Sequence, residues 1–218
     1  MRGAGEGAGE GRATEYPLSM SRVIAGAAGG RRLAVPPGQS TRPTSDRARE
    51  GLFGTVLSEL GTLDGRHVLD LYAGSGAVGL EALSRGAESV ILVESDARAA
   101  SVIKSNIRAV DLPGARVVTS RAEKFLSGPA PEKPQNRFDL MFADPPYAVT
   151  AEAITKILTM LAGGGWLADE ALIVVERATR SGALDWPPGY TAGKSRRYGE
   201  ATFWYGWHST ACAHAYEE

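Results

Sequence analysis

The stretch Asp70-Leu71-Tyr72-Ala73-Gly74-Ser75-Gly76-Ala77-Val78-Gly79 decides the fold. It begins inside a short apolar run at residues 67–71 and leads into a helix-like stretch at residues 78–85. The glycines at positions 74 and 76 let the chain turn tightly and approach a ligand without a Cβ in the way. A helix that starts here directs its N–H groups back at that ligand. The stretch therefore predicts a ligand-binding turn at one edge of an α/β sheet.

The rest of the chain repeats the same alternation. Further short apolar runs occur at residues 89–93, 116–118, 138–142 and 172–175. Helix-like stretches at residues 97–110 and 151–161 lie between these runs. Continuous β-branched strands that alternate with helices predict a parallel sheet covered on both faces, which is a doubly wound fold. Residues 190–197 and 201–207 then resemble a terminal antiparallel hairpin, and two short runs around residues 27–30 resemble an N-terminal hairpin.

The composition is that of an ordinary globular protein, with 43% hydrophobic and 22% charged residues among 218. No apolar run approaches the ~20 residues that a membrane-spanning helix needs. The single cysteine, Cys212, excludes an internal disulfide, and the Gly-rich first residues do not resemble a secretory signal. We therefore expect a cytoplasmic protein with no membrane partner and no structural metal.

Positive charge is concentrated near the N-terminus, although the net charge of the whole chain is −1. Between Ser21 and Arg49 there are six arginines and one acid, Asp46, which gives +5 for this segment. A local basic patch can bind phosphate groups or can simply be a solvated surface, and charge alone does not decide between the two. The arginines expected to contact a polyanion are Arg22, Arg31, Arg32 and Arg42.

Two acids flank the glycine turn. Glu94 ends the second strand, and an acid in this position can accept hydrogen bonds from both hydroxyls of a ribose. Asp70 lies at the end of the first strand, where a carboxylate suits the ammonium of a methionine moiety and would oppose a pyrophosphate. The glycine spacing alone also matches a dinucleotide-binding fingerprint. The acids favour S-adenosylmethionine, with these residues at its site: Asp70, Tyr72, Gly74, Ser75, Gly76 and Glu94.

The fourth strand ends in Asp144-Pro145-Pro146-Tyr147. An aromatic amine is a poor nucleophile because its lone pair is delocalised into the ring. The carboxylate of Asp144 and the carbonyl of Pro145 can each accept an N–H bond from such an amine and direct its lone pair outward. The two prolines fix φ and hold that carbonyl, and Tyr147 offers a flat face for a base. We therefore expect methyl transfer to the amino group of a base, which depends on positioning and charge stabilisation.

Asp-Leu-Tyr-Ala-Gly-Ser-Gly followed by Asp-Pro-Pro-Tyr resembles the class I amino-methyltransferases. The flanking segments resemble the bacterial 16S ribosomal RNA guanine-N2-methyltransferases of RsmD type, over about residues 21–207. These segments are Arg22-Val23-Ile24-Ala25-Gly26, Gly30-Arg31-Arg32-Leu33, Thr41-Arg42-Pro43-Thr44, Gly79-Leu80-Glu81-Ala82-Leu83 and Tyr198-Gly199-Glu200.

The resemblance implies a Rossmann-like fold with a seven-stranded, mostly parallel sheet, an antiparallel C-terminal hairpin and an N-terminal β-hairpin extension. The implied target is a guanine 2-amino group in 16S ribosomal RNA, within the small subunit or an assembly intermediate. The guanine would have to be unpaired or flipped out to reach the pocket, and the enzyme is expected to be a monomer. Ala122 would contact adenine through its N–H, although Arg121 stands where the family often has an acid. The implied organisation is a disordered leader at residues 1–20, an RNA-binding hairpin at 21–43, a methyltransferase domain at 44–208 and a flexible tail at 209–218.

Three other functions remain open at this point. A DNA adenine or cytosine amino-methyltransferase would use the same Asp-Pro-Pro-Tyr, although no separate target-recognition domain is evident. A non-catalytic RNA-binding assembly factor would not need Asp70, Glu94 and Asp144 together. An oxidoreductase would fit only the glycine turn. A 5-methylcytosine enzyme is disfavoured because it needs a catalytic thiolate, and Cys212 lies in the tail.

Overall fold

The computed structural model describes residues 20–36 and 45–209. Its main sheet has seven strands, in the spatial order β5-β4-β3-β6-β7-β9-β8. Their bounds are β3 (His67–Leu71), β4 (Ser89–Glu94), β5 (Ala115–Thr119), β6 (Phe138–Ala143), β7 (Leu167–Ala178), β8 (Tyr190–Tyr198) and β9 (Ala201–His208). The first five pair in parallel and β9 pairs antiparallel with both β7 and β8. This confirms the predicted doubly wound sheet with an antiparallel C-terminal hairpin.

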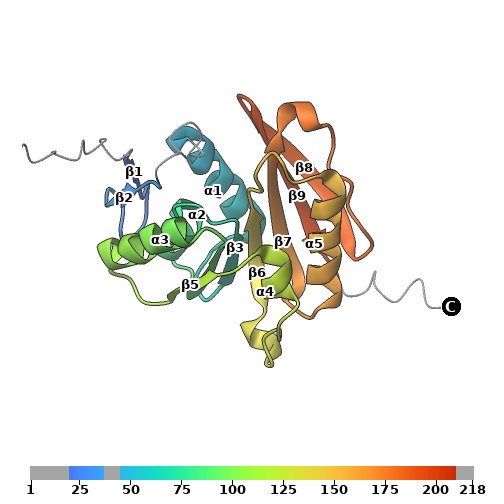
Figure 1. Ribbon diagram of the computed structural model, residues 1–218, viewed down its shortest axis with the longest axis horizontal. Coiled ribbons are helices and arrows are strands. Elements are labelled where there is room, and N and C mark those ends of the chain that lie inside the picture. The colour runs from blue at the N-terminus through green and yellow to red at the C-terminus, as the bar shows by residue number, and fades with distance from the viewer. Residues whose placement is uncertain (1–19, 37–44, 210–218) are drawn as a thin grey trace, which may run out of the picture.

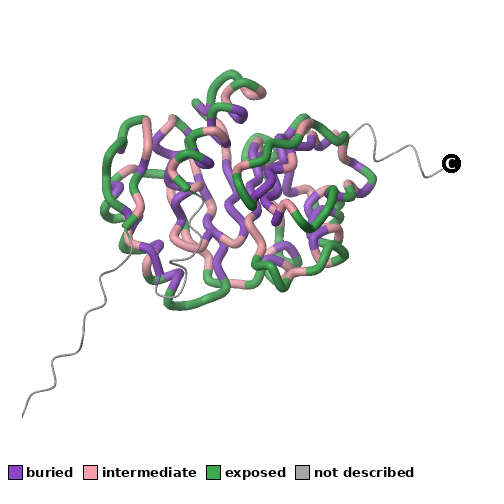
Figure 2. Tube along the Cα trace, turned by 90° about the horizontal axis from the view of Figure 1, so that it is seen from above, coloured by how far each residue is buried: buried purple, intermediate pink, exposed green. Residues whose placement is uncertain are grey.

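Helices cover both faces of the sheet (Figure 1). They are α1 (Asp46–Leu60), α2 (Ala77–Ser84), α3 (Ala97–Val110), α4 (Ala122–Leu126) and α5 (Ala151–Gly163), with short 3-10 turns η1 (Pro134–Asn136) and η2 (Thr179–Ser181). One apolar core joins α1, α2 and α3 to the sheet, and a second joins α4 and α5 to the opposite face. Figure 2 shows the resulting buried layer running through the strands. The continuous apolar strands are buried on both sides, as their composition predicts.

Polar side chains fix where three of the helices begin. Ser45, Asp96 and Thr150 each accept a hydrogen bond from the backbone N–H three residues later, at the starts of α1, α3 and α5. Ser45 is therefore the cap of the first helix. Such caps satisfy backbone donors that have no partner within the helix.

The N-terminal hairpin pairs β1 (Met20–Arg22) with β2 (Arg32–Ala34). It does not project from the molecule, because Val23, Ala28 and Leu33 are buried in a third core with α2 and α3. Glu81 of α2 accepts the backbone N–H groups of Ile24 and Ala25 at 2.6 and 3.0 Å. The predicted hairpin extension thus packs on α2, which follows the glycine turn, and on α3, which follows Glu94.

Two elements differ from the sequence prediction. Strand β7 has twelve residues, and its pairing with β6 shifts between Phe138 and Leu140, where Glu170 adopts φ of 55°. The polar residues at this irregularity interrupt the apolar pattern, so the sequence predicted only the second half of the strand. Helix α4 was not predicted, because five residues are too few to show a helical period. Within the part of the chain that the structure describes, no helix is long and apolar enough to cross a membrane.

Candidate active site

The strand register brings the two predicted halves of the site to one edge of the sheet. Leu71 of β3 pairs with Val93 of β4 and with Ala143 of β6. The residues that follow these three, which are Tyr72, Glu94 and Asp144, therefore continue one row across three neighbouring strands. The carboxyl ends of parallel strands are where open α/β sheets bind their ligands, so this row marks the candidate site.

The glycine turn has an unusual backbone. Tyr72, Gly74 and Gly76 have φ values of 62°, 57° and 77°, so three residues out of five are left-handed. This conformation is easy for glycine, but it costs free energy for tyrosine and is typical of ligand-binding turns. Gly76 caps α2 in this conformation. A Cβ on Gly79 would lie 2.8 Å from Leu92, so the third glycine lets α2 pack closely on the sheet.

Asp70 lies below this turn and is only 1% exposed. One oxygen of its carboxylate accepts the N–H of Gly79 at 2.9 Å. Burial raises the pKa of Asp70 to about 7, the bond from Gly79 opposes the rise, and the charge of Glu94 adds to it. Asp70 thus supports the turn from its buried side, and its contact with a methionine ammonium stays a prediction.

Glu94 joins the turn to the next helix. Its carboxylate accepts the N–H of Gly74 at 2.8 Å and the N–H of Asp96 at 2.8 Å. Glu94 is 8% exposed. Its Oε1 also accepts the hydroxyl of Ser95 at 3.5 Å, whereas Oε2, which accepts the N–H of Gly74, has a second lone pair for a further donor. A left-handed backbone cradle with a carboxylate at its rim fits a nucleoside that carries vicinal hydroxyls. Ala122, the predicted adenine contact, is buried and begins α4.

Asn106 is a buried residue of this site that sequence reasoning missed. From α3, its amide donates to the carbonyl of Ser75 at 2.8 Å and to that of Ala34 at 2.9 Å. Its carbonyl accepts the N–H of Ala34 at 2.9 Å. Asn106 therefore connects the glycine turn to strand β2 of the N-terminal hairpin. No local signal marks it, since one asparagine in a helix is ordinarily a surface residue.

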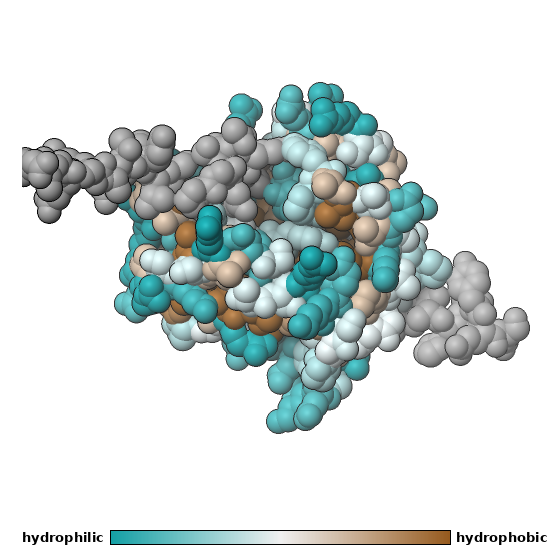
Figure 3. Space-filling model, viewed as in Figure 1, coloured by the Kyte–Doolittle hydropathy of each residue, from teal (hydrophilic) through white to brown (hydrophobic). Residues whose placement is uncertain are grey.

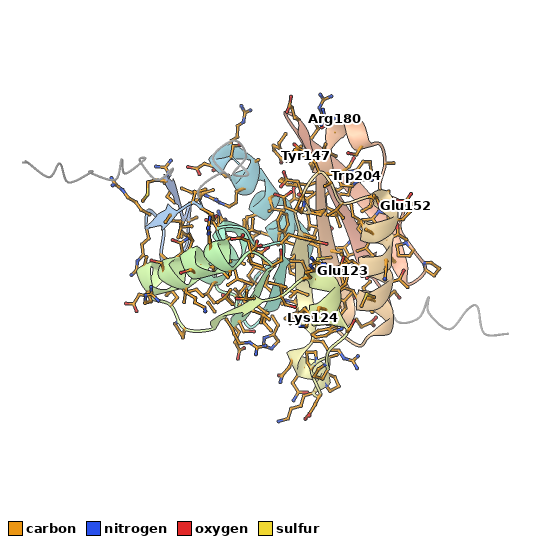
Figure 4. All side chains as sticks on the ribbon, viewed as in Figure 1. Glu123, Lys124, Tyr147, Glu152, Arg180 and Trp204 are labelled. Atoms are coloured by element: carbon orange, nitrogen blue, oxygen red, sulfur yellow. The ribbon has the colours of Figure 1, made fainter. Side chains whose placement is uncertain are left out.

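The other half of the site is the loop after β6. Asp144 and Pro145 are partly buried, whereas Pro146 is exposed and Tyr147 is 56% exposed. The guanidinium carbon of Arg180 lies 5.6 Å from the centroid of the Tyr147 ring. Figure 4 shows these two side chains together at the upper edge of the molecule. Arg180 was missed by sequence reasoning because it belongs to η2, after a different strand.

The structure gives the N-terminal arginines different surroundings. Arg31 bonds the carbonyls of Ala109 and Val110 at the end of α3, where a cation is favoured by the helix dipole. Arg22 pairs with Asp46 at 3.1 Å, and Arg22 lies directly opposite Arg32 in the hairpin, with both exposed. Arg31 would therefore have to give up these bonds to the end of α3, or share them, to make the predicted RNA contact. Arg42 lies outside the described residues, as do residues 1–19 and 210–218 of the predicted leader and tail.

A doubly wound sheet with this strand order, a left-handed glycine turn and an Asp-Pro-Pro-Tyr loop at the same edge defines a class I S-adenosylmethionine-dependent methyltransferase. The structure of magnesium protoporphyrin IX methyltransferase from Synechocystis, which contains bound S-adenosylmethionine, has the same fold. Its TM-score is 0.58 at 13% identity, over 75% of this chain and 79% of that one.

The family described as Conserved hypothetical protein 95 matches residues 21–207, and the chain belongs to this family. Ribosomal RNA small subunit methyltransferase D of Escherichia coli is 36% identical over 182 residues, which cover 84% of this chain and 87% of that protein. The solved structure of protein TTHA0928 from Thermus thermophilus has a TM-score of 0.67 at 34% identity, over 85% of this chain and 98% of that one. The predicted resemblance to the RsmD-type family is confirmed.

Proposed function

We propose that the protein transfers a methyl group from S-adenosylmethionine to the 2-amino group of a guanine in 16S ribosomal RNA. The observation that carries this proposal is the shared row of Tyr72, Glu94 and Asp144 at the carboxyl edge of the sheet. It puts a nucleoside cradle beside a loop suited to an aromatic amine. The similarity to Ribosomal RNA small subunit methyltransferase D supports ribosomal RNA as the substrate.

The glycine turn and Glu94 would hold the cofactor, which supplies an electrophilic methyl group when bound. Glu94 would accept the ribose hydroxyls, Ala122 would meet the adenine and the residues 72–76 would surround the methionine end. Asp70 would contact the ammonium of the methionine moiety, and it already accepts the N–H of Gly79 beneath the turn. Since the turn already has its left-handed shape, binding does not have to reorganise it.

The loop after β6 would hold the target base. Tyr147 would stack on its ring, and Asp144 with the Pro145 carbonyl would accept the two hydrogens of the amine. These bonds localise the lone pair on nitrogen and stabilise the positive charge that develops there. Pro145 and Pro146 restrict the loop, so that its carbonyl is aimed before the base arrives. The proton leaves afterwards, because a methylated cationic amine is a strong acid.

The substrate would be the small subunit or an assembly intermediate, and the target guanine would be unpaired or flipped out. The enzyme would act as a monomer in the cytoplasm, with residues 44–208 as the methyltransferase domain and the hairpin at 21–43 beside it. Exposed Arg22 and Arg32, with Arg42, would contact the RNA backbone.

The direct test is methyl transfer in vitro from labelled S-adenosylmethionine to small subunits from cells that lack the protein. We expect N2-methylguanine in the digested RNA with the wild-type enzyme, and at least about a hundredfold slower formation with Asp144→Asn. Asp64→Asn, in an exposed turn before β3 at the opposite, amino-terminal edge of the sheet, should match the wild type. Methylation of adenine or cytosine, or of DNA alone, would contradict the proposal.

A further inference from the structure

The contact between Arg180 and Tyr147 covers a surface that the proposed reaction needs. The guanidinium carbon lies 5.6 Å from the ring centroid, within the range of a cation–π contact. Tyr147 is one of two large hydrophobic residues that are exposed among the described residues. A base that stacks on the face of the ring where Arg180 packs would compete with this arginine for that face.

The topology explains why Arg180 reaches this position. Ala143 at the end of β6 pairs with Val175 of β7, and β7 continues to Ala178, so the last residues of β7 lie beside the loop after β6. Arg180 lies in η2, immediately after β7. The position of this arginine is therefore fixed by the sheet, and it belongs to the same edge as the candidate active site.

The tip of the β8–β9 hairpin extends this edge. The N–H of Thr179 donates to the carbonyl of Glu200 at 2.7 Å, which joins η2 to the hairpin tip. Arg196 and Arg197 are exposed and lie just before the tip. Figure 3 shows hydrophilic residues gathered along this upper edge of the molecule, where Figure 4 places Arg180. The active-site loop is thus bordered by cations on the β7–β9 side.

A second basic segment, residues 177–197, carries nearly as much positive charge as the N-terminal one. Residues 177–197 contain five cations and one acid, Asp185, which gives +4. Lys194 is paired with Glu59 at 2.5 Å, and Arg177 bonds the carbonyl of Ala183. Arg197 uses only its Nε to reach the carbonyl of Gly199, and a guanidinium has five N–H donors. Arg196 pairs with Phe203, which faces the α1 core, whereas Arg197 pairs with Thr202, whose hydroxyl contacts that of Thr179 in η2. Arg180 and Arg197 are therefore the cations of this segment that lie toward the candidate site.

We propose that Arg180 and Arg197 form a second RNA-binding surface, which holds the phosphates that flank the flipped target nucleotide. In the free protein Arg180 rests on Tyr147. When the base stacks on Tyr147, Arg180 leaves the ring for a phosphate, because a charge-assisted bond is stronger than an exposed cation–π contact. RNA is the favoured partner because the guanidinium fork matches phosphate and the adjacent ring matches a base. This inference rests on the proposed function.

The test compares Arg180→Ala, Arg197→Ala and the double variant with Arg116→Ala. Arg116 is exposed on β5, the edge strand opposite β8, and Lys133 is exposed before η1. Arg116→Ala therefore matches each single variant in net charge, and Arg116→Ala with Lys133→Ala matches the double variant. Binding is measured by filter retention, with small subunits from cells that lack the protein, over a range of salt concentrations. Methylation is measured on the same particles, and cofactor affinity is measured by calorimetry.

We expect the double variant to bind at least about tenfold more weakly and to lower the salt slope by about two, one unit for each phosphate contact. Arg180→Lys should keep the slope, because it keeps the charge. Cofactor affinity and the far-ultraviolet circular dichroism spectrum should be unchanged, and Arg116→Ala should match the wild type.

Three results would overturn the inference while leaving the proposed function intact. One is methylation by the wild type together with unchanged binding and slope in the double variant. Another is a loss as large in Arg116→Ala, which would mean a general charge effect. The third is a loss of binding to the small subunits while all variants bind protein-free 16S RNA equally. This result would indicate that the arginines contact an acidic protein of the particle. If the wild type methylates no RNA, the proposed function itself fails.

Discussion

Tyr147 illustrates how much of the account depends on single side chains. We expect Tyr147→Phe to retain most of the methyl transfer, because stacking needs the ring and not the hydroxyl. Tyr147→Ala removes the ring and should raise KM for the small subunit at least about tenfold, since stacking on an aromatic side chain contributes about 1–3 kcal/mol per base. Steady-state kinetics of the two variants checks this. Equal KM values for the two variants would mean that the base stacks elsewhere.

Asp70 gives a pH-dependent prediction, because burial raises its pKa to about 7 from the ordinary value of about 4. Between these two values the folded protein binds the proton more tightly than the unfolded chain does. The buried carboxyl therefore stabilises the fold at low pH, and this contribution is lost as the pH rises from about 4 to about 7. Asp70→Asn keeps an acceptor for Gly79 and does not ionise.

We therefore expect the free energy of unfolding of Asp70→Asn, relative to the wild type, to increase from pH 4 to pH 8. The change should be on the order of a few kcal/mol. Urea denaturation at several pH values measures it. A difference that stays constant with pH would show that the carboxyl does not titrate in this range.

At the scale of elements, Asn106 connects α3, the glycine turn and the N-terminal hairpin. Asn106→Ala removes three hydrogen bonds and leaves backbone groups of Ala34 and Ser75 without this partner. We expect the free energy of unfolding to fall by about 2–3 kcal/mol and cofactor affinity to fall severalfold. Thermal denaturation and calorimetry check both effects. The exposed Asn136→Ala is the control, and cofactor affinity equal in the two variants would remove Asn106 from the site.

The docking of the hairpin on α2 can be tested with a pair of glycines. Gly26 and Gly30 have similar φ values of 83° and 84°, so alanine costs similar backbone strain at both, about 1–2 kcal/mol. A Cβ on Gly26 would lie 1.8 Å from the carbonyl oxygen of Ser84, whereas a Cβ on Gly30 has no atom within 4 Å. Gly26→Ala should be less stable than Gly30→Ala by about 1–3 kcal/mol in denaturant unfolding. Equal stabilities would mean that the hairpin is not docked here.

The strands and longer helices could be predicted from the sequence because each combines an apolar pattern with a cap or a glycine. Helix α3 begins and ends where it was predicted, at Ala97–Val110. The contacts between elements could not be predicted in this way. Glu81, Asn106 and Arg180 act on residues far away in the chain, and only the packing of α2, α3 and η2 brings them there. Buried polar residues follow no period that would separate them from solvated ones.

At the scale of the whole molecule, the chain carries two basic segments, one that includes the N-terminal hairpin and one at residues 177–197. The N-terminal arginines are partly committed to the fold, since Arg49 is 1% exposed and Arg31 bonds α3. The predicted role of Arg22, Arg32 and Arg42 in RNA binding stays a prediction. Arg180 of the C-terminal segment contacts Tyr147 in the loop after β6, although the sequence alone drew attention to the N-terminal cluster.

The most direct test of the central claim is mass spectrometry of 16S ribosomal RNA from cells that lack this protein. The account predicts that one N2-methylguanine is lost, that the wild-type gene restores it, and that the Asp144→Asn gene does not. Asp64→Asn should restore it as fully as the wild type does. An unchanged set of methylguanines in the deletion strain, or full restoration by Asp144→Asn, would contradict the account.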